Sequence, residues 1–189
     1  MQEQTALVVE VPAADPAVAP WRRRYDRAAR AGVPAHVTVC FPFLPPHELD
    51  DHERDGHERD DDVEEALAVL AGATPGFAAT FTRVDSFGEA VLWLAPEPDE
   101  PLRALTRAVC TTFGLLPYGG AHGGVDDAVP HLTVAEDPPD PAAVRADLAP
   151  QLPITQHVRQ LTLLQGAFVP GGWRVRRRFP LAGRTADPR

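Results

Sequence analysis

Two short stretches, His36-Val37-Thr38-Val39 and His131-Leu132-Thr133-Val134, share one pattern and lie in opposite halves of the chain. Each follows a valine-proline pair, directly in the second stretch and with one alanine between in the first. Because proline biases the residue before it toward extended backbone, each tetrad is expected to enter as a β-strand. Residues i and i+2 of a strand share a face. The histidine and threonine of each tetrad are therefore predicted to point one way, and the aliphatic pair into the core.

The pairing of the two tetrads is the informative feature. A lone His-x-Thr strand is best interpreted as a structural histidine, because seven histidines make single matches common. Apolar residues stand at both remaining positions of both tetrads, in a chain that is 44% hydrophobic. The chance of such a matched pair is roughly 0.4%. The matched pair therefore indicates that the two histidines are functional rather than structural.

The rest of the chain alternates between strand and helix patterns. Strands are predicted over 5–11, 36–43, 77–84, 90–95, 131–135, 158–168 and 173–179, and helices over 16–31, 63–71, 102–113 and 141–148. Several joins have hairpin character, which favours an α+β fold with mainly antiparallel sheets. Each half contains a helix, a valine-proline stop and a strand opening with histidine. This repetition predicts a duplicated, two-lobed architecture with flanking helices around a central cleft.

Length and charge limit the classes of function. The 189 residues suit a single domain over 1–189 that consists of two pseudo-symmetric lobes. The net charge of −9 resides entirely between Glu48 and Glu65, where 11 acidic residues face two arginines. The remainder holds 16 acidic residues and 16 arginines. Such a neutral body is not expected to track long nucleic acid by counterion release, although it can hold one or two phosphates.

Localisation is predicted from the cysteines and the N-terminus. Two cysteines, Cys40 and Cys110, are too few for a disulfide framework. The N-terminal residues lack the basic region of a secretory signal, and no apolar run reaches the roughly 18 residues of a membrane span. We therefore expect a cytoplasmic monomer with no membrane partner.

In these tetrads the sequence resembles the 2H phosphoesterases, a superfamily that includes the bacterial 2′-5′ RNA ligase and RNA 2′,3′-cyclic phosphodiesterase proteins. The resemblance implies two similar α+β lobes with both histidines facing one phosphate. It implies that His36 and His131 are the catalytic acid/base pair and that Thr38 and Thr133 bind phosphate oxygens. The implied partner is a nucleotide or RNA terminus with a cyclic or 2′-5′ phosphodiester. The acidic insertion at 47–62 and the absence of lysine depart from the family's pattern.

The residue types suit this chemistry independently of the resemblance. Hydrolysis of a 2′,3′-cyclic phosphodiester removes a proton from water and delivers one to the departing sugar oxygen. Histidine can do either near neutral pH. Threonine hydroxyls can donate to phosphate oxygens without adding charge. No metal or cofactor is needed for this reaction. The sequence leaves open which histidine is the acid, and whether the product is a 2′- or a 3′-phosphate.

Other motifs have structural interpretations beside functional ones. His47, His52 and His57 could suggest a metal site, but HExxxH spacing does not place the last two on one helical face. A solvated loop is favoured for 47–62. The glycine-rich run 119–124 lacks the lysine of a P-loop and is interpreted as a lid or linker. Cys40 shares strand parity with His36, so it is predicted to border the cleft, without a nucleophilic role.

Three further side chains are candidates for substrate contact. Tyr118 and Trp173 could stack a base, since every base has a π-face, although core or rim packing is an alternative. Arg176 lies on the last strand, where alternation places it on a polar face that faces phosphate or solvent.

Two rival functions belong to other classes. The first is a non-catalytic module that uses the tetrads to bind a phosphate or an RNA end. The second is a metal-dependent hydrolase that uses the histidine-rich acidic loop. Turnover distinguishes the first from the phosphodiesterase, and removal of the loop distinguishes the second.

Overall fold

The computed structural model describes residues 2–50, 61–121 and 123–183. The strands in chain order are β1 (Gln4–Glu10), β2 (His36–Cys40), β3 (Phe77–Phe87), β4 (Val91–Pro96), β5 (Leu132–Glu136), β6 (Ile154–Val158), β7 (Gln160–Gly166) and β8 (Arg174–Pro180). The α-helices are α1 (Asp15–Tyr25), α2 (Arg27–Arg30), α3 (His47–Asp50), α4 (Asp61–Ala73), α5 (Glu100–Phe113) and α6 (Pro141–Leu148). Short 3₁₀ turns occupy 12–14, 117–120, 125–127 and 149–151.

The strands form two four-stranded sheets, ordered β2-β1-β7-β8 and β5-β4-β3-β6. Every neighbouring pair of strands within a sheet is antiparallel. The first tetrad forms most of β2, and the second lies at the start of β5, with His131 immediately before that strand. Both tetrads thus belong to edge strands, each paired with the strand that precedes it in the chain. The α+β, two-lobed antiparallel fold predicted from the sequence is confirmed.

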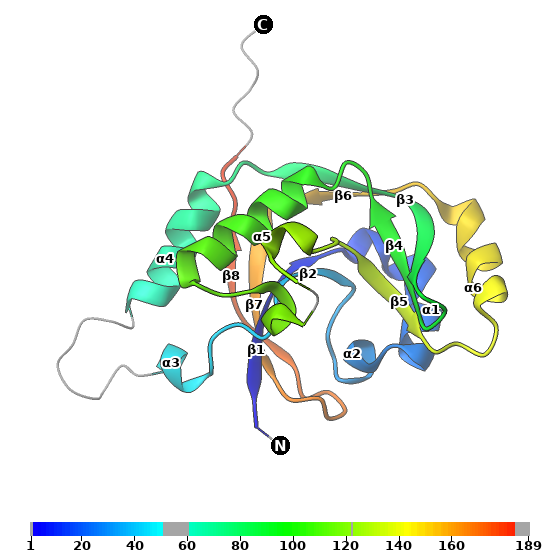
Figure 1. Cartoon of the computed structure of the whole chain (residues 1–189), viewed down its shortest axis with the longest axis horizontal. Coiled ribbons are helices and arrows are strands. Elements are labelled where there is room, and N and C mark those ends of the chain that lie inside the picture. Colours follow the sequence, from blue (N-terminus) through cyan, green and yellow to red (C-terminus); the bar gives the residue numbers. More distant parts are fainter. Residues whose placement is uncertain (1, 51–60, 122, 184–189) are drawn as a thin grey trace, which may run out of the picture.

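Helices tie the two halves together. Helix α1, which connects β1 to β2, packs against β5 of the other sheet, and α5, which connects β4 to β5, packs against β2. This exchange brings the two edge strands face to face near the centre of the molecule (Figure 1). Helix α5 ends at Gly114, whose φ of 64° is the left-handed conformation that favours glycine at a helix C-terminus.

One apolar core is continuous across both sheets, and it contains the aliphatic residues of both tetrads. Val37 and Val39 are 1% and 2% exposed, and Leu132 and Val134 are fully buried. The alternation predicted for the tetrads is therefore correct. A smaller apolar cluster lies on the other face of the first sheet and includes Trp173.

Two predicted elements were divided wrongly. The predicted helix 16–31 is broken at Asp26, whose extended backbone ends α1 and whose carboxylate accepts a hydrogen bond from the Ala28 N–H to cap α2. The predicted strand 158–168 is two strands. The chain leaves the second sheet at Val158 and enters the first at Gln160, so one continuous extended run takes part in two different pairings. The strand expected over 36–43 ends at Cys40.

The acidic segment was predicted as a loop over 47–62. Its described ends are helical instead, because 47–50 form α3 and 61–62 begin α4. His52 and His57 lie outside the described residues. Among the residues that the structure describes, no helix has the length and apolar character needed to cross a membrane.

Candidate active site

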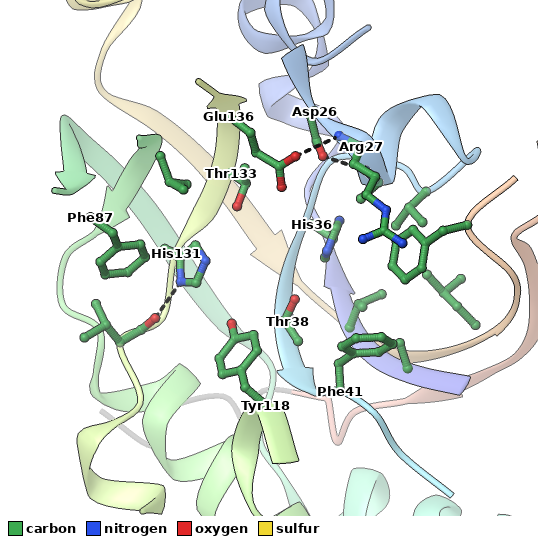
Figure 2. Close-up of a pocket in the computed structure, with 18 of the residues that line it drawn as sticks. Asp26, Arg27, His36, Thr38, Phe41, Phe87, Tyr118, His131, Thr133 and Glu136 are labelled. Atoms are coloured by element: carbon green, nitrogen blue, oxygen red, sulfur yellow. Dashed lines mark hydrogen bonds between the residues drawn. The ribbon is translucent and has the colours of Figure 1, made fainter. Parts of the chain in front are cut away.

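A cavity of about 570 Å³ lies between the two tetrad strands. His36 and Thr38 line it from the first sheet, and His131 and Thr133 line it from the second. Figure 2 shows the two imidazoles on facing walls of this cavity, with the threonine hydroxyls beside them. The two-residue periodicity of each strand thus directs the histidine and threonine of each tetrad into the cavity. The packing of α1 against β5 and of α5 against β2 holds the two cavity walls opposite one another.

Each tetrad histidine is held by the same backbone contact. The Nδ1 atom of His36 lies 2.8 Å from the carbonyl oxygen of Pro34, and Nδ1 of His131 lies 2.7 Å from that of Val129. A carbonyl oxygen only accepts hydrogen bonds, so Nδ1 must carry the hydrogen in both rings. The Nε2 atom of each imidazole is therefore the one that can exchange a proton with a substrate.

Both tetrad strands contain a β-bulge at the same place. In β2 the partners of Thr38 and Cys40 are the adjacent residues Val8 and Leu7, so Val39 is the extra residue. In β5, Val134 is the extra residue between partners of Trp93 and Leu92. A bulge reverses the alternation of side chains beyond it. As a result, Phe41 and Glu136, each five residues after a tetrad histidine, line the cavity.

The bulge overturns the prediction made for Cys40. Strand parity placed this thiol beside His36 at the cleft, but the reversed alternation turns it into the main core, where it is fully buried. A hydrogen bond with the Cys110 thiol, together with burial, raises the pKa of Cys40. The thiol is therefore unsuited to act as a nucleophile.

A buried ion pair lies behind His36. Nε of Arg22 donates to a carboxylate oxygen of Asp26 at 2.8 Å, and the two side chains are 5% and 2% exposed. Burial, and after it the positive charge of Arg22, lowers the pKa of His36 to about 4, against opposing effects of the Pro34 carbonyl and Asp26. His36 is consequently neutral at pH 7.

Aromatic rings surround His131. Its ring centroid lies 4.9 Å from that of Phe87, 5.8 Å from that of Trp93 and 6.1 Å from that of Tyr118. The planes of Phe87 and Trp93 make angles of 86° and 60° with the imidazole plane, as in edge-to-face contacts. The Tyr118 ring is stacked on the imidazole with an interplanar angle of 23°. These contacts fix the plane of the ring.

Tyr118 connects the two tetrads. While its ring stacks on His131, its hydroxyl shares a hydrogen bond with Thr38, and burial raises the pKa of the phenol to about 12. The residue has a φ of 52°, a left-handed conformation that is strained for a bulky side chain. The turn at 117–120 therefore places one phenol against both walls of the cavity.

The whole sequence was compared with models of known protein families. Residues 9–168 match the model of the 2′-5′ RNA ligase superfamily. The chain belongs to this superfamily. A search of curated proteins found no match.

Solved structures support the fold of this superfamily member. Escherichia coli LigT complexed with NADP⁺ aligns with a TM-score of 0.59 at 19% identity, over 96% of this chain and 98% of that one. LigT complexed with 3′-AMP aligns with a TM-score of 0.57 at 21% identity, over 96% and 99%. The protein TT0787 of Thermus thermophilus aligns with a TM-score of 0.57 at 20% identity, over 96% and 100%. At these identities the likeness concerns the fold.

Of the three remaining candidates for substrate contact, two line the cavity and one does not. Tyr118 and Trp173 both line the cavity. Trp173 is 6% exposed and packs its ring against Phe41 and Phe168. Arg176 is not among the lining residues. Its guanidinium bonds Glu64, Gln165 and the carbonyl of Leu49, so it joins β8 to α3 and α4.

Sequence reasoning missed many of the lining residues, among them Arg27, Phe41, Glu136 and Phe168. The Arg27 guanidinium lies over the Phe168 ring, 4.2 Å from its centroid. The sequence held a signal for Phe41 and Glu136, because they occupy equivalent positions after the two tetrads. That signal was hidden by the bulges, which sequence patterns do not show.

Two further predicted motifs are the glycine-rich run and the histidine-rich acidic segment. The first two residues of the glycine-rich run, Gly119 and Gly120, belong to the turn 117–120 that carries Tyr118, and both have positive φ. Within residues 2–50, 61–121 and 123–183, no three His, Cys, Asp or Glu side chains are grouped so that they could hold a metal ion. His47 is among these described residues, whereas His52 and His57 are not.

Proposed function

We propose that this protein is a phosphodiesterase that hydrolyses 2′,3′-cyclic or 2′-5′-linked phosphodiesters of nucleotides or RNA ends in the cytoplasm, without a metal ion. One observation carries the proposal. Two imidazoles that are both fixed through Nδ1 present Nε2 to one cavity, each beside a threonine hydroxyl. Membership of the 2′-5′ RNA ligase superfamily supports the same reaction class.

The two histidines have different roles in the proposed reaction. His36, neutral at pH 7, accepts a proton on Nε2 from the attacking water as the new P–O bond forms. His131 donates a proton from Nε2 to the sugar oxygen as its bond to phosphorus breaks. Each turnover on a cyclic substrate consumes one cyclic phosphodiester and one water and yields one nucleoside monophosphate. After turnover, one proton must pass from His36 to His131, directly or through solvent.

The threonines hold the phosphate between the two histidines. Their hydroxyls donate to the non-bridging oxygens, where charge increases as water adds to phosphorus. Tyr118 orients the Thr38 hydroxyl through their shared hydrogen bond and holds the His131 ring by stacking.

Mass spectrometry tests the proposal. The purified protein is incubated with nucleoside 2′,3′-cyclic phosphates in the presence of EDTA, and the addition of one water is measured. Catalytic turnover is expected. Binding of the cyclic phosphate with no gain of water would favour the non-catalytic module, and 2′-5′-linked dinucleotides in the same assay test the second substrate class.

A further inference from the structure

The charges on the cavity wall are unusual for a site that binds phosphate. Three carboxylates, those of Asp26, Asp127 and Glu136, line the cavity, whereas Arg27 is the one arginine among the described lining residues. A cavity adapted to polyanions would be expected to show the opposite balance.

Two of these carboxylates already have structural partners. Asp26 is paired with the buried Arg22. Asp127 accepts a hydrogen bond of 2.8 Å from the Gly124 N–H and holds the turn at 125–127. Their charges are therefore compensated in part by the protein itself.

Glu136 differs from Asp26 in having no ion pair in the described part of the chain, and from Asp127 in bonding the N–H of a residue 109 positions away rather than one in its own turn. One of its carboxylate oxygens accepts a hydrogen bond of 3.2 Å from the backbone N–H of Arg27, and within the described ranges it makes no ion pair. The side chain is exposed and comes from the same strand as Thr133, where the bulge at Val134 turns it toward the cavity. Figure 2 shows its carboxylate above Thr133, between the two walls.

We propose that Glu136 is a specificity-determining residue that makes the site select a phosphodiester with a single negative charge and disfavour substrates with a further phosphate. This inference rests on the proposed function and narrows its substrate class to nucleoside 2′,3′-cyclic phosphates without other phosphate groups. The equivalent position in the first sheet is Phe41, which carries no charge, so the selection comes from one wall.

The physical basis is repulsion between fixed charges in a half-enclosed site. A second phosphate held at about 7 Å from the carboxylate, at an effective dielectric constant of about 40, would weaken binding on the order of five- to tenfold. The same repulsion acts on the product, because ring opening converts a monoanionic diester into a monoester of nearly two charges at pH 7. Glu136 would thus also favour product release.

Turnover of paired substrates tests the inference. A nucleoside 2′,3′-cyclic phosphate with a free 5′-hydroxyl is compared with the same compound bearing a 5′-phosphate, for the wild type, Glu136→Gln and Glu65→Gln. The amide introduced by Glu136→Gln keeps an acceptor for the Arg27 N–H, so the fold is retained. Glu65 is an exposed residue of α4 outside the cavity lining, and its variant carries the same change of charge.

The wild type is expected to prefer the 5′-hydroxyl substrate in kcat/KM by on the order of five- to tenfold, and more at low salt. Glu136→Gln should remove most of this preference, and Glu65→Gln should retain it. An unchanged preference in Glu136→Gln, or an equal change in both variants, would overturn the inference while the hydrolysis itself upholds the proposed function.

A binding measurement keeps the two proposals separable. The dissociation constants of a nucleoside 3′-phosphate and a nucleoside 3′,5′-bisphosphate are measured by calorimetry for the same three proteins. If no protein hydrolyses either cyclic substrate, the proposed function fails. The ratio of these two constants then decides the role of Glu136 alone, since a ratio that Glu136→Gln does not change contradicts it.

Discussion

The two tetrad strands, β2 and β5, have the same backbone design and different surroundings. Each lies at the edge of a sheet, bonds its histidine Nδ1 to a carbonyl two residues earlier, and bulges at the residue after threonine. Behind His36 lies a buried ion pair, whereas His131 is surrounded by aromatic rings. The duplicated backbone sets where the imidazoles lie, and the unduplicated neighbours give the two imidazoles different electrostatic surroundings.

The largest expected effect comes from removing either imidazole. His36→Ala and His131→Ala should each lower kcat/KM for a 2′,3′-cyclic nucleotide by about 10²- to 10⁴-fold, the usual contribution of one proton transfer. Circular dichroism and thermal unfolding verify that both variants fold. His157→Ala is the matched control, because this exposed histidine of β6 does not line the cavity. Near-normal turnover in either tetrad variant would remove that histidine from the mechanism.

The buried environment of His36 should appear in the pH dependence of stability. Its pKa is about 4 in the folded protein against an ordinary value of 6.5, so the unfolded chain binds more protons between these values. Stability is therefore full above about pH 6.5 and falls as the pH approaches 4. Between pH 7.5 and pH 5, His36 should account for about 2 kcal/mol of the lost free energy of unfolding.

Urea unfolding at these two pH values measures this contribution. His36→Asn should reduce the loss on acidification, whereas His157→Asn should leave it at the wild-type value. If His36→Asn shows the full wild-type loss, the neutral state of His36 is not the cause.

The two threonines should differ in a way that reflects Tyr118. Thr38→Val and Thr133→Val should each lower kcat/KM by roughly ten- to hundredfold, because each removes a hydrogen bond to a charged phosphate. Only Thr38→Val should also lower the free energy of unfolding, by about 1 kcal/mol, because it removes the hydrogen bond to Tyr118. Tyr118→Phe should reproduce that loss of stability. Equal stabilities for Thr38→Val and Thr133→Val would contradict the connecting role of Tyr118.

The smallest expected effect is that of metal removal. Extensive dialysis against EDTA should leave kcat/KM unchanged, and so should the double variant His52→Ala/His57→Ala. Activity that is lost on chelation and restored by a divalent cation would instead favour the metal-dependent hydrolase.

Much of the fold could be predicted because the tetrads are local signals. Proline lead-ins and two-residue alternation identified both strands and the face of each side chain in the two tetrads. The division between the two sheets at Arg159 could not be predicted, since a single residue separates β6 from β7 and no proline or glycine marks the change of sheet. The break at Asp26 depends on a capping carboxylate that also pairs with Arg22, which is a tertiary property.

The candidate site was predictable only as far as strand parity holds. His36 and Thr38 precede the bulge in β2, and parity places them correctly. Cys40 and Glu136 follow bulges, so parity assigns each of them to the wrong face. The single-domain and monomer interpretations, and the catalytic roles themselves, stay predictions.

The division of labour between the two histidines is tested most directly by changing the leaving group. His36→Ala and His131→Ala are assayed on a 2′,3′-cyclic nucleotide and on a nucleoside phosphodiester with a nitrophenolate leaving group, which departs without a proton. The rate defect of His131→Ala should shrink by at least about tenfold on the activated substrate, while that of His36→Ala persists. Equal defects on both substrates, or a defect that shrinks only in His36→Ala, would contradict the assignment of His36 as base and His131 as acid.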